Sequence, residues 1–235
     1  MSTSYFAFLK PNSLPIDRNN RNQILEMNDN IVYILPTVHL SYHSSQGLFE
    51  SDLIEWSKQF CSKDKIFIDI GAHTGTYALS LADFCQHVYA FEPQKDTYYA
   101  LCGGVALSNK KNVTCHQMGL GSPEQIGVNR LKIVHSSGGG SSLHATTGII
   151  GEEDVMIQTL DQFNLDNVGF IKMDVEENEY YVLKGATETL KRCGYPRILF
   201  ESNDDNKQLF EFIENLGEYK IVKINGYSNM YLASH

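Results

Sequence analysis

The sequence predicts an α/β fold in which a doubly wound, mostly parallel sheet carries helices on both faces. Short apolar runs alternate with helix-like segments from residue 66 onward, which is the pattern of consecutive strand–helix–strand units. Two short apolar segments around Asn225-Gly226 close the chain and predict an antiparallel hairpin. With 235 residues, 42% apolar and 20% charged, the chain is long and apolar enough to build one such domain.

Residues 1–60 are expected to form an N-terminal arm and helix that pack on the core or cover the site. Residues 1–30 are polar and rich in Asn, so we expect an arm on the surface or against a partner. Residues 31–35 predict a strand that Pro36 ends. Residues 47–60 predict a helix, because Leu48, Leu53 and Trp56 recur near helical spacing.

Residues 61–235 are expected to form the main domain. Its predicted core strands are Ile66–Ile70, His87–Phe91, 113–118, 168–175 and 197–200, with the hairpin at 219–224 and 230–233. Accessory strands are expected at 128–134 and 155–160. One predicted helix begins near residues 74–77. Three others cover residues 94–108, 182–190 and 209–216. A Gly/Ser-rich loop over residues 135–148 interrupts this alternation and is expected to close over the site or to remain an ordinary surface loop.

Charge and cysteine content narrow the function. The formal net charge of −9 argues against binding nucleic acid, which needs clustered Lys and Arg. The five cysteines are odd in number and form no Cys-x-x-Cys pair, which is typical of reduced thiols and of a cytoplasmic protein. No stretch approaches the roughly 20 apolar residues of a membrane span, and the first residues lack the features of a secretory signal.

Acidic residues follow four of the predicted core strands. In doubly wound sheets, ligands bind outside the carboxyl ends of the strands. The residues expected there are Asp69, Gly71, Glu92, Gly119, Asp174, Glu176 and Glu201. Gly71 and Gly75 allow a tight turn into a helix whose first N–H groups can meet a polar ligand. A carboxylate buried at a strand end, as expected for Asp69, requires a partner.

Glu92 lies 23 residues after Asp69, where an acid can accept hydrogen bonds from both hydroxyls of a ribose. The first turn reads Gly-x-x-x-Gly and lacks the middle glycine that lets backbone approach a pyrophosphate. These features favour a nucleoside cofactor without a pyrophosphate, S-adenosylmethionine. An NAD-binding or nucleotide-sugar enzyme, such as an epimerase, remains the alternative, although Tyr181 and Lys184 are one residue too close for its Tyr-x-x-x-Lys pair. A catalytically inactive binding module with this fold is the third alternative.

Five segments resemble the FkbM family of S-adenosylmethionine-dependent methyltransferases. They are Asp-x-Gly-Ala-x-x-Gly at 69–75, Tyr-Ala-Phe-Glu-Pro at 89–93, Ile-Lys-Met-Asp-Val-Glu at 171–176, Thr-Leu-Asp at 159–161 and Gly-x-x-Glu at 47–50. The resemblance implies a Rossmann-like class I methyltransferase fold over residues 61–235, with a seven-stranded sheet and an antiparallel C-terminal hairpin strand. One departure is Glu177, where the family usually has glycine.

The resemblance also implies a cofactor pocket. Asp69, Gly71 and Gly75 shape its methionine end, Ala72 and His73 line the turn, and Glu92 holds the ribose. Gln94 borders the adenine, and Gly119 and Leu120 are closer adenine neighbours. Glu50 either pairs with the ammonium group of the cofactor or meets the dipole of its own helix.

The expected reaction is O-methylation of a small acceptor, with sugars and glycans as the leading class. The candidate bases for the acceptor hydroxyl are Asp174, Glu176, Glu201 and His144, and Asp174 is the first choice. The alternative for Asp174 is a cofactor-binding role, in which its carboxylate only hydrogen-bonds the cofactor or the backbone. A divalent metal on Asp174 and Glu201 is a second mechanism that the two oxygen ligands do not favour. Lys172 is expected to neutralise a nearby acid or to form a structural ion pair. The sequence also allows a homodimer.

Overall fold

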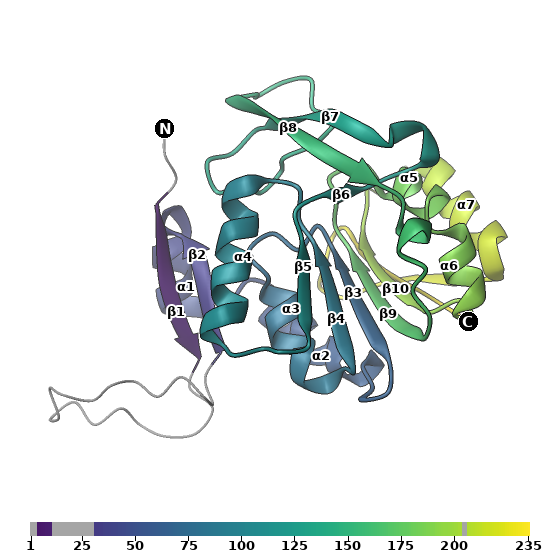
Figure 1. Cartoon of the computed structure of the whole chain (residues 1–235), viewed down its shortest axis with the longest axis horizontal. Coiled ribbons are helices and arrows are strands. Elements are labelled where there is room, and N and C mark those ends of the chain that lie inside the picture. Colours follow the sequence, from purple (N-terminus) through teal and green to yellow (C-terminus); the bar gives the residue numbers. More distant parts are fainter. Residues whose placement is uncertain (1–3, 11–30, 204–205) are drawn as a thin grey trace, which may run out of the picture.

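The computed structural model describes residues 4–10, 31–203 and 206–235. Its central sheet has seven strands in the order β11-β12-β10-β9-β3-β4-β5 (Figure 1). The strands are β3 (Ile66–Ile70), β4 (His87–Phe91), β5 (Val113–His116), β9 (Val168–Met173), β10 (Arg197–Glu201), β11 (Lys220–Lys223) and β12 (Met230–Ser234). Five strands run parallel, namely β3, β4, β5, β9 and β10. Strand β12 pairs antiparallel with both β10 and β11. The predicted mostly parallel seven-stranded sheet with an antiparallel C-terminal hairpin strand is therefore confirmed.

The strand order reverses between β3 and β9. From β3 the chain adds β4 and β5 on one side, and it then returns to place β9 and β10 on the other side. Such a reversal opens a crevice at the carboxyl ends of the two central strands, and this is where ligands of doubly wound sheets bind. Asp69 on β3 lies opposite Lys172 on β9 in the register of this central pair.

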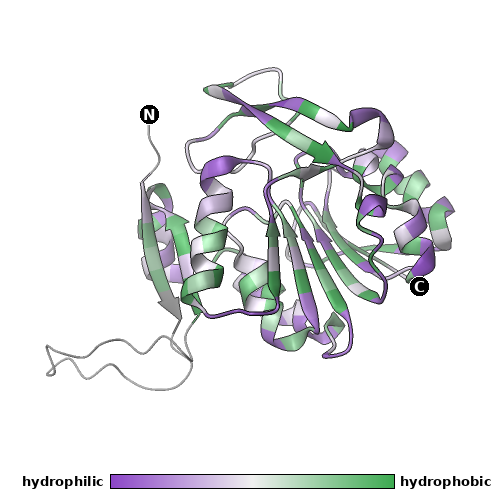
Figure 2. Cartoon of the chain, viewed as in Figure 1, coloured by the Kyte–Doolittle hydropathy of each residue, from purple (hydrophilic) through white to green (hydrophobic). Residues whose placement is uncertain are grey.

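Helices cover both faces of the sheet because residues on both sides of its strands belong to buried apolar clusters. Figure 2 shows the apolar stretches of these strands. One face packs against α2 (Ser51–Ser57), α3 (Thr76–Leu81) and α4 (Lys95–Leu107), and the other against α5 (Glu179–Lys184), α6 (Thr187–Arg192) and α7 (Lys207–Gly217). Successive residues of β3 show the alternation: Phe67 belongs to the first core and Ile68 to the second. Short 3-10 helices lie at Thr37–His39, Lys58–Phe60, Ala82–Phe84, Pro123–Gln125 and Leu160–Phe163.

The N-terminal segment is more ordered than the sequence predicts. Instead of a polar arm alone, Tyr5–Lys10 forms strand β1, which pairs antiparallel with β2 (Ile31–Pro36), and residues 11–30 lie outside the described part. This hairpin packs on α4 at Gly103 and Gly104, where a Cβ on Gly103 would lie 2.5 Å from Ile34 Cδ1. Helix α1 (Leu40–Gln46) was not predicted, and the expected helix over residues 47–60 begins only at Ser51.

One predicted helix is two helices. The expected helix over residues 182–190 is broken at Gly185, whose Cβ, if it had one, would lie 2.0 Å from the carbonyl oxygen of Gly121. Asp161 then caps the second helix, since its carboxylate accepts hydrogen bonds from the N–H groups of Glu188 (3.2 Å) and Thr189 (2.7 Å). The Thr-Leu-Asp motif of the sequence thus has a structural role at the start of α6.

A second, three-stranded sheet stands over the carboxyl edge of the first one. It has the order β6-β8-β7 and consists of β6 (Gly119–Leu120), β7 (Gly127–Ile133) and β8 (Gly151–Gln158). The predicted strand over residues 113–118 ends early at His116, because Gly119 and Leu120 leave the core sheet to pair with β8. No helix in the described part of the chain has the length and apolar character needed to cross a membrane.

Candidate active site

A cavity of about 450 Å³ lies at the carboxyl ends of the central strands. Nine of the predicted site residues line it: Glu50, Gly71, Ala72, His73, Glu92, Gly119, Leu120, Asp174 and Glu176. Five others lie outside its lining: Asp69, Gly75, Gln94, His144 and Glu201. The cavity is within the usual size range for small-molecule sites and, as in most of them, apolar groups make up much of its wall.

The turn after β3 is held by the neighbouring strand. The N–H groups of Gly71 and Ala72 both donate to the carbonyl oxygen of Phe91, at 3.0 and 2.9 Å. Asp69 lies below this turn, fully buried, and its Oδ2 accepts a hydrogen bond of 2.9 Å from the N–H of Ala78. Burial raises the pKa of Asp69 to about 6 despite the nearby Lys172 ammonium. Asp69 therefore fixes the start of α3 and does not reach the cavity wall.

The carboxylate of Glu92 lines the cavity, and protein donors fill only part of its hydrogen-bonding capacity. Oε1 accepts hydrogen bonds from Gln94 N (2.9 Å) and Thr97 Oγ1 (2.8 Å), and Oε2 accepts one from His73 N (2.8 Å). Burial raises the pKa of this carboxyl, and the three hydrogen bonds oppose that effect. Since each carboxylate oxygen can accept two hydrogen bonds, Oε2 keeps one acceptor position for a ligand.

Glu50 reaches the cavity from the N-terminal segment. It precedes α2 in a left-handed conformation, with φ of 54°, and its Oε2 accepts a hydrogen bond of 2.8 Å from the hydroxyl of Tyr77 on α3. This contact joins the N-terminal segment to the first helix of the main domain. It holds a carboxylate at the cavity wall.

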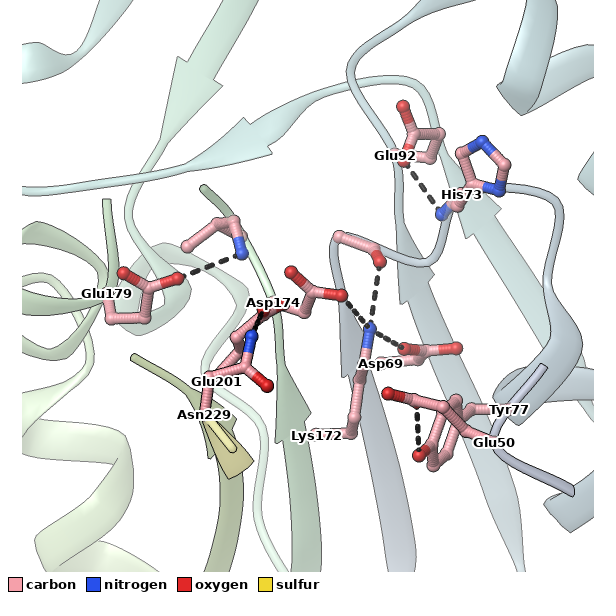
Figure 3. A network of polar contacts seen from close by, with 12 residues as sticks. Glu50, Asp69, His73, Tyr77, Glu92, Lys172, Asp174, Glu179, Glu201 and Asn229 are labelled. Carbon is pink, nitrogen blue, oxygen red and sulfur yellow. Dashed lines mark hydrogen bonds and ion pairs between the residues drawn. The ribbon is translucent and has the colours of Figure 1, made fainter. Parts of the chain in front are cut away.

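Lys172 lies at the centre of the polar network (Figure 3). Its Nζ is 3.5 Å from Asp174 Oδ2 and 3.9 Å from Asp69 Oδ1, and it donates a 3.2 Å hydrogen bond to the carbonyl oxygen of Gly71. It also lies 5.3 Å from the ring centroid of Tyr77. Burial lowers the pKa of Lys172, but Asp174 and Asp69 more than compensate, so the net shift is upward. Among the cavity-lining residues of the described chain, Lys172 carries the only ammonium or guanidinium group.

Asp174 and Glu201 form a coupled pair of carboxyl groups. Burial raises the pKa of Glu201, and the charge and hydrogen bond of Asp174 raise it further, to about 9. For Asp174, burial alone would raise the pKa, but the charge of Lys172 and the hydrogen bond with Glu201 leave it below its ordinary value. The Asn229 amide donates to Glu201 Oε1. The two carboxyl groups titrate together, and the directions of both shifts favour the proton on Glu201 and the negative charge on Asp174.

Glu201 lines a second, smaller hollow of about 90 Å³. Glu176 lines both this hollow and the main cavity, so the two adjoin. Glu177 lines the hollow as well. Glu176 and Glu177 both have a positive φ, 52° and 76°. The second value is one that glycine adopts most readily, and the chain has a glutamate there.

The predicted Gly/Ser loop lies over the main cavity and is anchored on both sides. His73 Nε2 is hydrogen-bonded to the carbonyl oxygen of Ser137 (2.8 Å), and the hydroxyl of Ser141 donates to Gln94 Oε1 (2.9 Å). At the far side the Ser142 hydroxyl donates to the carbonyl oxygen of Glu176 (2.6 Å). Gln94, which does not line the cavity, thus helps to position the loop through its contact with Ser141.

His144 does not line the cavity. Its Nε2 is hydrogen-bonded to Asn178 Oδ1 (2.9 Å), and its ring stacks on Tyr181 at 5.5 Å. This geometry places His144 beside α5. The hydrogen bond and the stacking account for its position structurally.

An aromatic wall of the cavity was missed by sequence reasoning. It consists of His39, His43 and Phe49, with the His39 and Phe49 rings 5.1 Å apart and the His43 and Phe49 rings 4.8 Å apart. His39 also stacks on His135 of the loop at 5.9 Å. Burial and the neighbouring histidines lower the pKa of His39, so its ring is neutral at neutral pH. The only sequence signal was the proximity of these residues to the Gly-x-x-Glu segment at 47–50.

The described residues contain no group of three or more His, Cys, Asp or Glu side chains arranged to hold a metal ion.

Comparisons with known proteins show what this chain is similar to. Residues 69–223 match the methyltransferase FkbM domain family. The hexuronic acid methyltransferase AglP of Haloferax volcanii is 25% identical over 184 residues, which cover 75% of this chain and 73% of that protein. A methyltransferase FkbM from Methylobacillus flagellatus has a crystal structure that superposes with a TM-score of 0.55 at 18% identity, over 74% of this chain. This chain spans 44% of the length of that one.

A more distant structure shows the fold alone. An rRNA methylase from Streptococcus thermophilus superposes with a TM-score of 0.50 at 13% identity, over 77% of this chain and 90% of that chain. The family match covers the turn after β3, Glu92 and the segment of Lys172 and Asp174, which form part of the cavity wall, whereas Glu50 and the His39, His43 and Phe49 wall lie before the matched residues. The chain therefore belongs to the FkbM family of S-adenosylmethionine-dependent methyltransferases.

Proposed function

We propose that this protein transfers a methyl group from S-adenosylmethionine to a hydroxyl of a small acceptor, a sugar or the sugar of a glycan. The observation that carries this proposal is a single cavity that has Glu92 in its wall at the end of β4 and the ionised Asp174 at the end of β9. The first is suited to hold a ribose, and the second is suited to accept a proton. Both are needed for transfer to a hydroxyl, and one ligand-sized space joins them.

The residues of the cavity fit the cofactor. The remaining acceptor position on Glu92 Oε2 suits a ribose hydroxyl. Gly119, Leu120 and Ile157 supply apolar surface for an adenine near the same strand end, and all three are buried or closely packed. Glu50 offers a carboxylate to the ammonium of the methionine part. Asp69 acts indirectly in this assignment, because it shapes the turn from below.

When bound, S-adenosylmethionine supplies an activated methyl carbon, which forms a bond to the acceptor oxygen as its bond to sulfur breaks and leaves the electron pair on sulfur. The protein then has two tasks, to align the acceptor oxygen and to take its proton. Asp174 is the proposed proton acceptor, because it is the ionised carboxylate of the coupled pair and lines the cavity. Glu176 is the nearest alternative on the same wall, whereas His144 lies outside it.

A sugar acceptor is supported by two independent features. The similar archaeal protein is named a hexuronic acid methyltransferase. The cavity also adjoins a hollow lined with carboxyl, hydroxyl and amide groups, including Ser202, Asn203 and Asn206. Such groups can make hydrogen bonds to several hydroxyls of one acceptor. The family match disfavours the NAD-binding alternative, and a catalytically inactive module is tested directly by the experiment below.

Calorimetry with S-adenosylhomocysteine tests the cofactor site. Saturable binding is expected for the unaltered protein and at least tenfold weaker binding for Glu92→Ala, since a hydrogen bond to a charged group contributes about 1.5–3 kcal/mol. Glu124→Ala removes an exposed acid that pairs with Lys184 and is the matched control. Absence of binding by the unaltered protein would refute the proposal.

Incubation with S-adenosylmethionine labelled in the methyl group and a panel of methyl glycosides, free sugars and nucleotides tests the acceptor. Label is expected on at least one sugar and on none of the nucleotides. Binding of S-adenosylhomocysteine with no transfer to any member would favour the inactive module.

A further inference from the structure

We propose that Lys172 is a positioning residue for methyl transfer: its buried ammonium ties the cofactor turn to Asp174 and keeps the Asp174 carboxylate, rather than that of Asp69 or Glu201, charged and aimed at the cavity. This inference rests on the proposed function, since it assigns the proton acceptor of that reaction a partner. It gives Lys172 a role beyond a structural ion pair.

The geometry places Lys172 between the two parts of the site. Its Nζ donates to the carbonyl oxygen of Gly71 in the cofactor turn (3.2 Å) and lies 3.5 Å from Asp174 Oδ2. The side chain is only 6% exposed, so solvent screens these contacts weakly. The carbonyl contact fixes the ammonium in space, and the ammonium in turn fixes the direction of the Asp174 carboxylate (Figure 3).

The charges around Lys172 come from several elements. Asp69 on β3 faces it at 3.9 Å, with Tyr77 on α3 nearby, and Glu50 approaches from the N-terminal segment. Around Asp174, the titratable groups are His73 in the turn, Glu176 in the following loop, Glu201 on β10 and Glu179 on α5. Glu92 adds its charge to the surroundings of Asp69. Most of these titratable groups of the described residues are carboxyl groups, and Lys172 is the one ammonium among them.

Lys172 selects one acid from this set because the acids differ in exposure. Asp69 is fully buried and keeps a high pKa even beside the ammonium. Glu201 has no contact with the ammonium as close as that of Asp174 and carries the proton of the coupled pair. The Asp174 side chain is 33% exposed, so its ionised form has the lowest desolvation penalty of the two carboxylates that Lys172 meets. The negative charge therefore resides on the acid that faces the acceptor.

The test is a carboxyl titration by NMR in protein labelled with ¹³C-aspartate, with Asp174→Asn used to assign the Asp174 signal. In the unaltered protein Asp174 is expected to titrate below the usual value for aspartate. In Lys172→Met its midpoint should rise by one pH unit or more, a tenfold change in proton affinity, and Lys172→Arg should restore most of the shift. Lys184→Met, which removes a more exposed lysine paired with Glu124, is the matched control and should leave the midpoint unchanged.

An Asp174 midpoint that is the same in the unaltered protein and in Lys172→Met would overturn the inference. If Lys172→Met fails to fold, the unaltered protein still decides the question through the ¹³Cε signal of Lys172. That signal should show an inflection at the Asp174 midpoint, and the inflection should vanish in Asp174→Asn. No inflection would overturn the inference as well.

Binding of S-adenosylhomocysteine, measured separately, distinguishes this outcome from a failure of the proposed function. If the protein binds the cofactor product but Asp174 titrates independently of Lys172, only the positioning role is wrong. If the titration behaves as expected and no cofactor product binds, the proposed reaction is wrong and the ion pair is structural.

Discussion

Gly71 packs directly against the main-chain carbonyl of Asp174, so that a Cβ on Gly71 would lie 1.8 Å from the carbonyl oxygen. The N–H of Asp174 also donates to the carbonyl oxygen of Ile70 (3.0 Å). The cofactor turn and the proposed proton acceptor are therefore in backbone contact across the reversal point of the sheet. The contact is close enough for one side chain, Lys172, to bind both, and any group inserted between them would separate the two halves of the site.

Gly71→Ala is expected to disrupt this contact. The new methyl group would overlap the Asp174 carbonyl, and the positive φ of 73° adds strain of about 1–2 kcal/mol. We expect destabilisation well above that strain alone and loss of S-adenosylhomocysteine binding, measured by urea unfolding and calorimetry. Gly148→Ala is the matched control, because Gly148 has a similar φ of 69° but no atom within 4 Å of a Cβ. Equal effects of the two substitutions would contradict the packing argument.

The acceptor is expected to be uncharged or cationic. Because the proposed assignment places Glu50 and Glu92 on the cofactor, the carboxylates left to face the acceptor are those of Asp174 and Glu176, and Lys172, the single ammonium among the described wall residues, is already paired. A hexuronic acid would meet these like charges without an Arg or Lys of the described wall to bind its carboxylate. Neutral and amino methyl glycosides should therefore be methylated with kcat/KM at least tenfold above the matching uronic acid, and the difference should shrink in high salt.

Replacing Glu176 tests the cause of this selectivity. Glu176→Gln removes one charge from the acceptor wall and should narrow the gap between neutral and acidic sugars. Glu188→Gln, on α6, is a control that should leave the gap unchanged. Faster methylation of a uronic acid than of its neutral counterpart by the unaltered protein would contradict the expectation, and it would align this protein with its archaeal relative.

The fold was predictable because its signals are local. The apolar runs at β3, β4 and β9 and the periodic helices between them gave strand identity and order, and the Asn225-Gly226 hairpin gave the antiparallel edge. Features set by distant contacts were missed. The break at Gly185 depends on the carbonyl of Gly121, 64 residues earlier, and the early end of β5 depends on pairing of Gly119 with β8. Neither contact can be predicted from the spacing of apolar residues along the sequence.

The site was predictable where a residue type at a strand end already implies its position. Glu92, Asp174 and the Gly71 turn belong to this group. The aromatic wall of His39, His43 and Phe49 lies on a segment with no motif of its own, and only the fold brings it to the cavity. Conversely, His144 and Glu201 have suitable chemistry, but tertiary packing places them outside the main cavity wall.

Asp174→Asn is expected to lower kcat by about 10²–10⁴, the usual contribution of a general base. Binding of S-adenosylhomocysteine should change little, since Asn preserves the shape of the side chain and the cofactor contacts lie mainly at Glu92 and the turn. Glu176→Gln should lower kcat less. Rates measured with and without a chelator address the metal alternative: an unchanged rate is expected, and a rate abolished by the chelator and restored by Mg²⁺ would favour a metal on Asp174 and Glu201.

The stability of the protein should fall as the pH rises from about 4.5 to 7, and Glu179 is one cause. Its side chain is buried, and burial together with the charges of Asp174 and Glu176 raises its pKa from 4.5 to about 7. The folded protein therefore holds this proton across a window in which the unfolded chain releases it. Folding takes up a proton there, and the free energy of unfolding decreases with pH.

Glu179→Gln should flatten this dependence, because the amide cannot titrate and its oxygen can still accept the 3.0 Å hydrogen bond from Val175 N. Between pH 4.5 and 7 the free energy of unfolding of the unaltered protein should fall by more than that of Glu179→Gln. At 1.36 kcal/mol per pKa unit, this extra fall should be at most about 3 kcal/mol. Urea unfolding at pH 5 and pH 8 measures it, with Glu214→Gln on the exposed side of α7 as the control. Parallel pH dependences for Glu179→Gln and the unaltered protein would contradict this expectation, because they would show that Glu179 releases its proton at the usual pH of a glutamate.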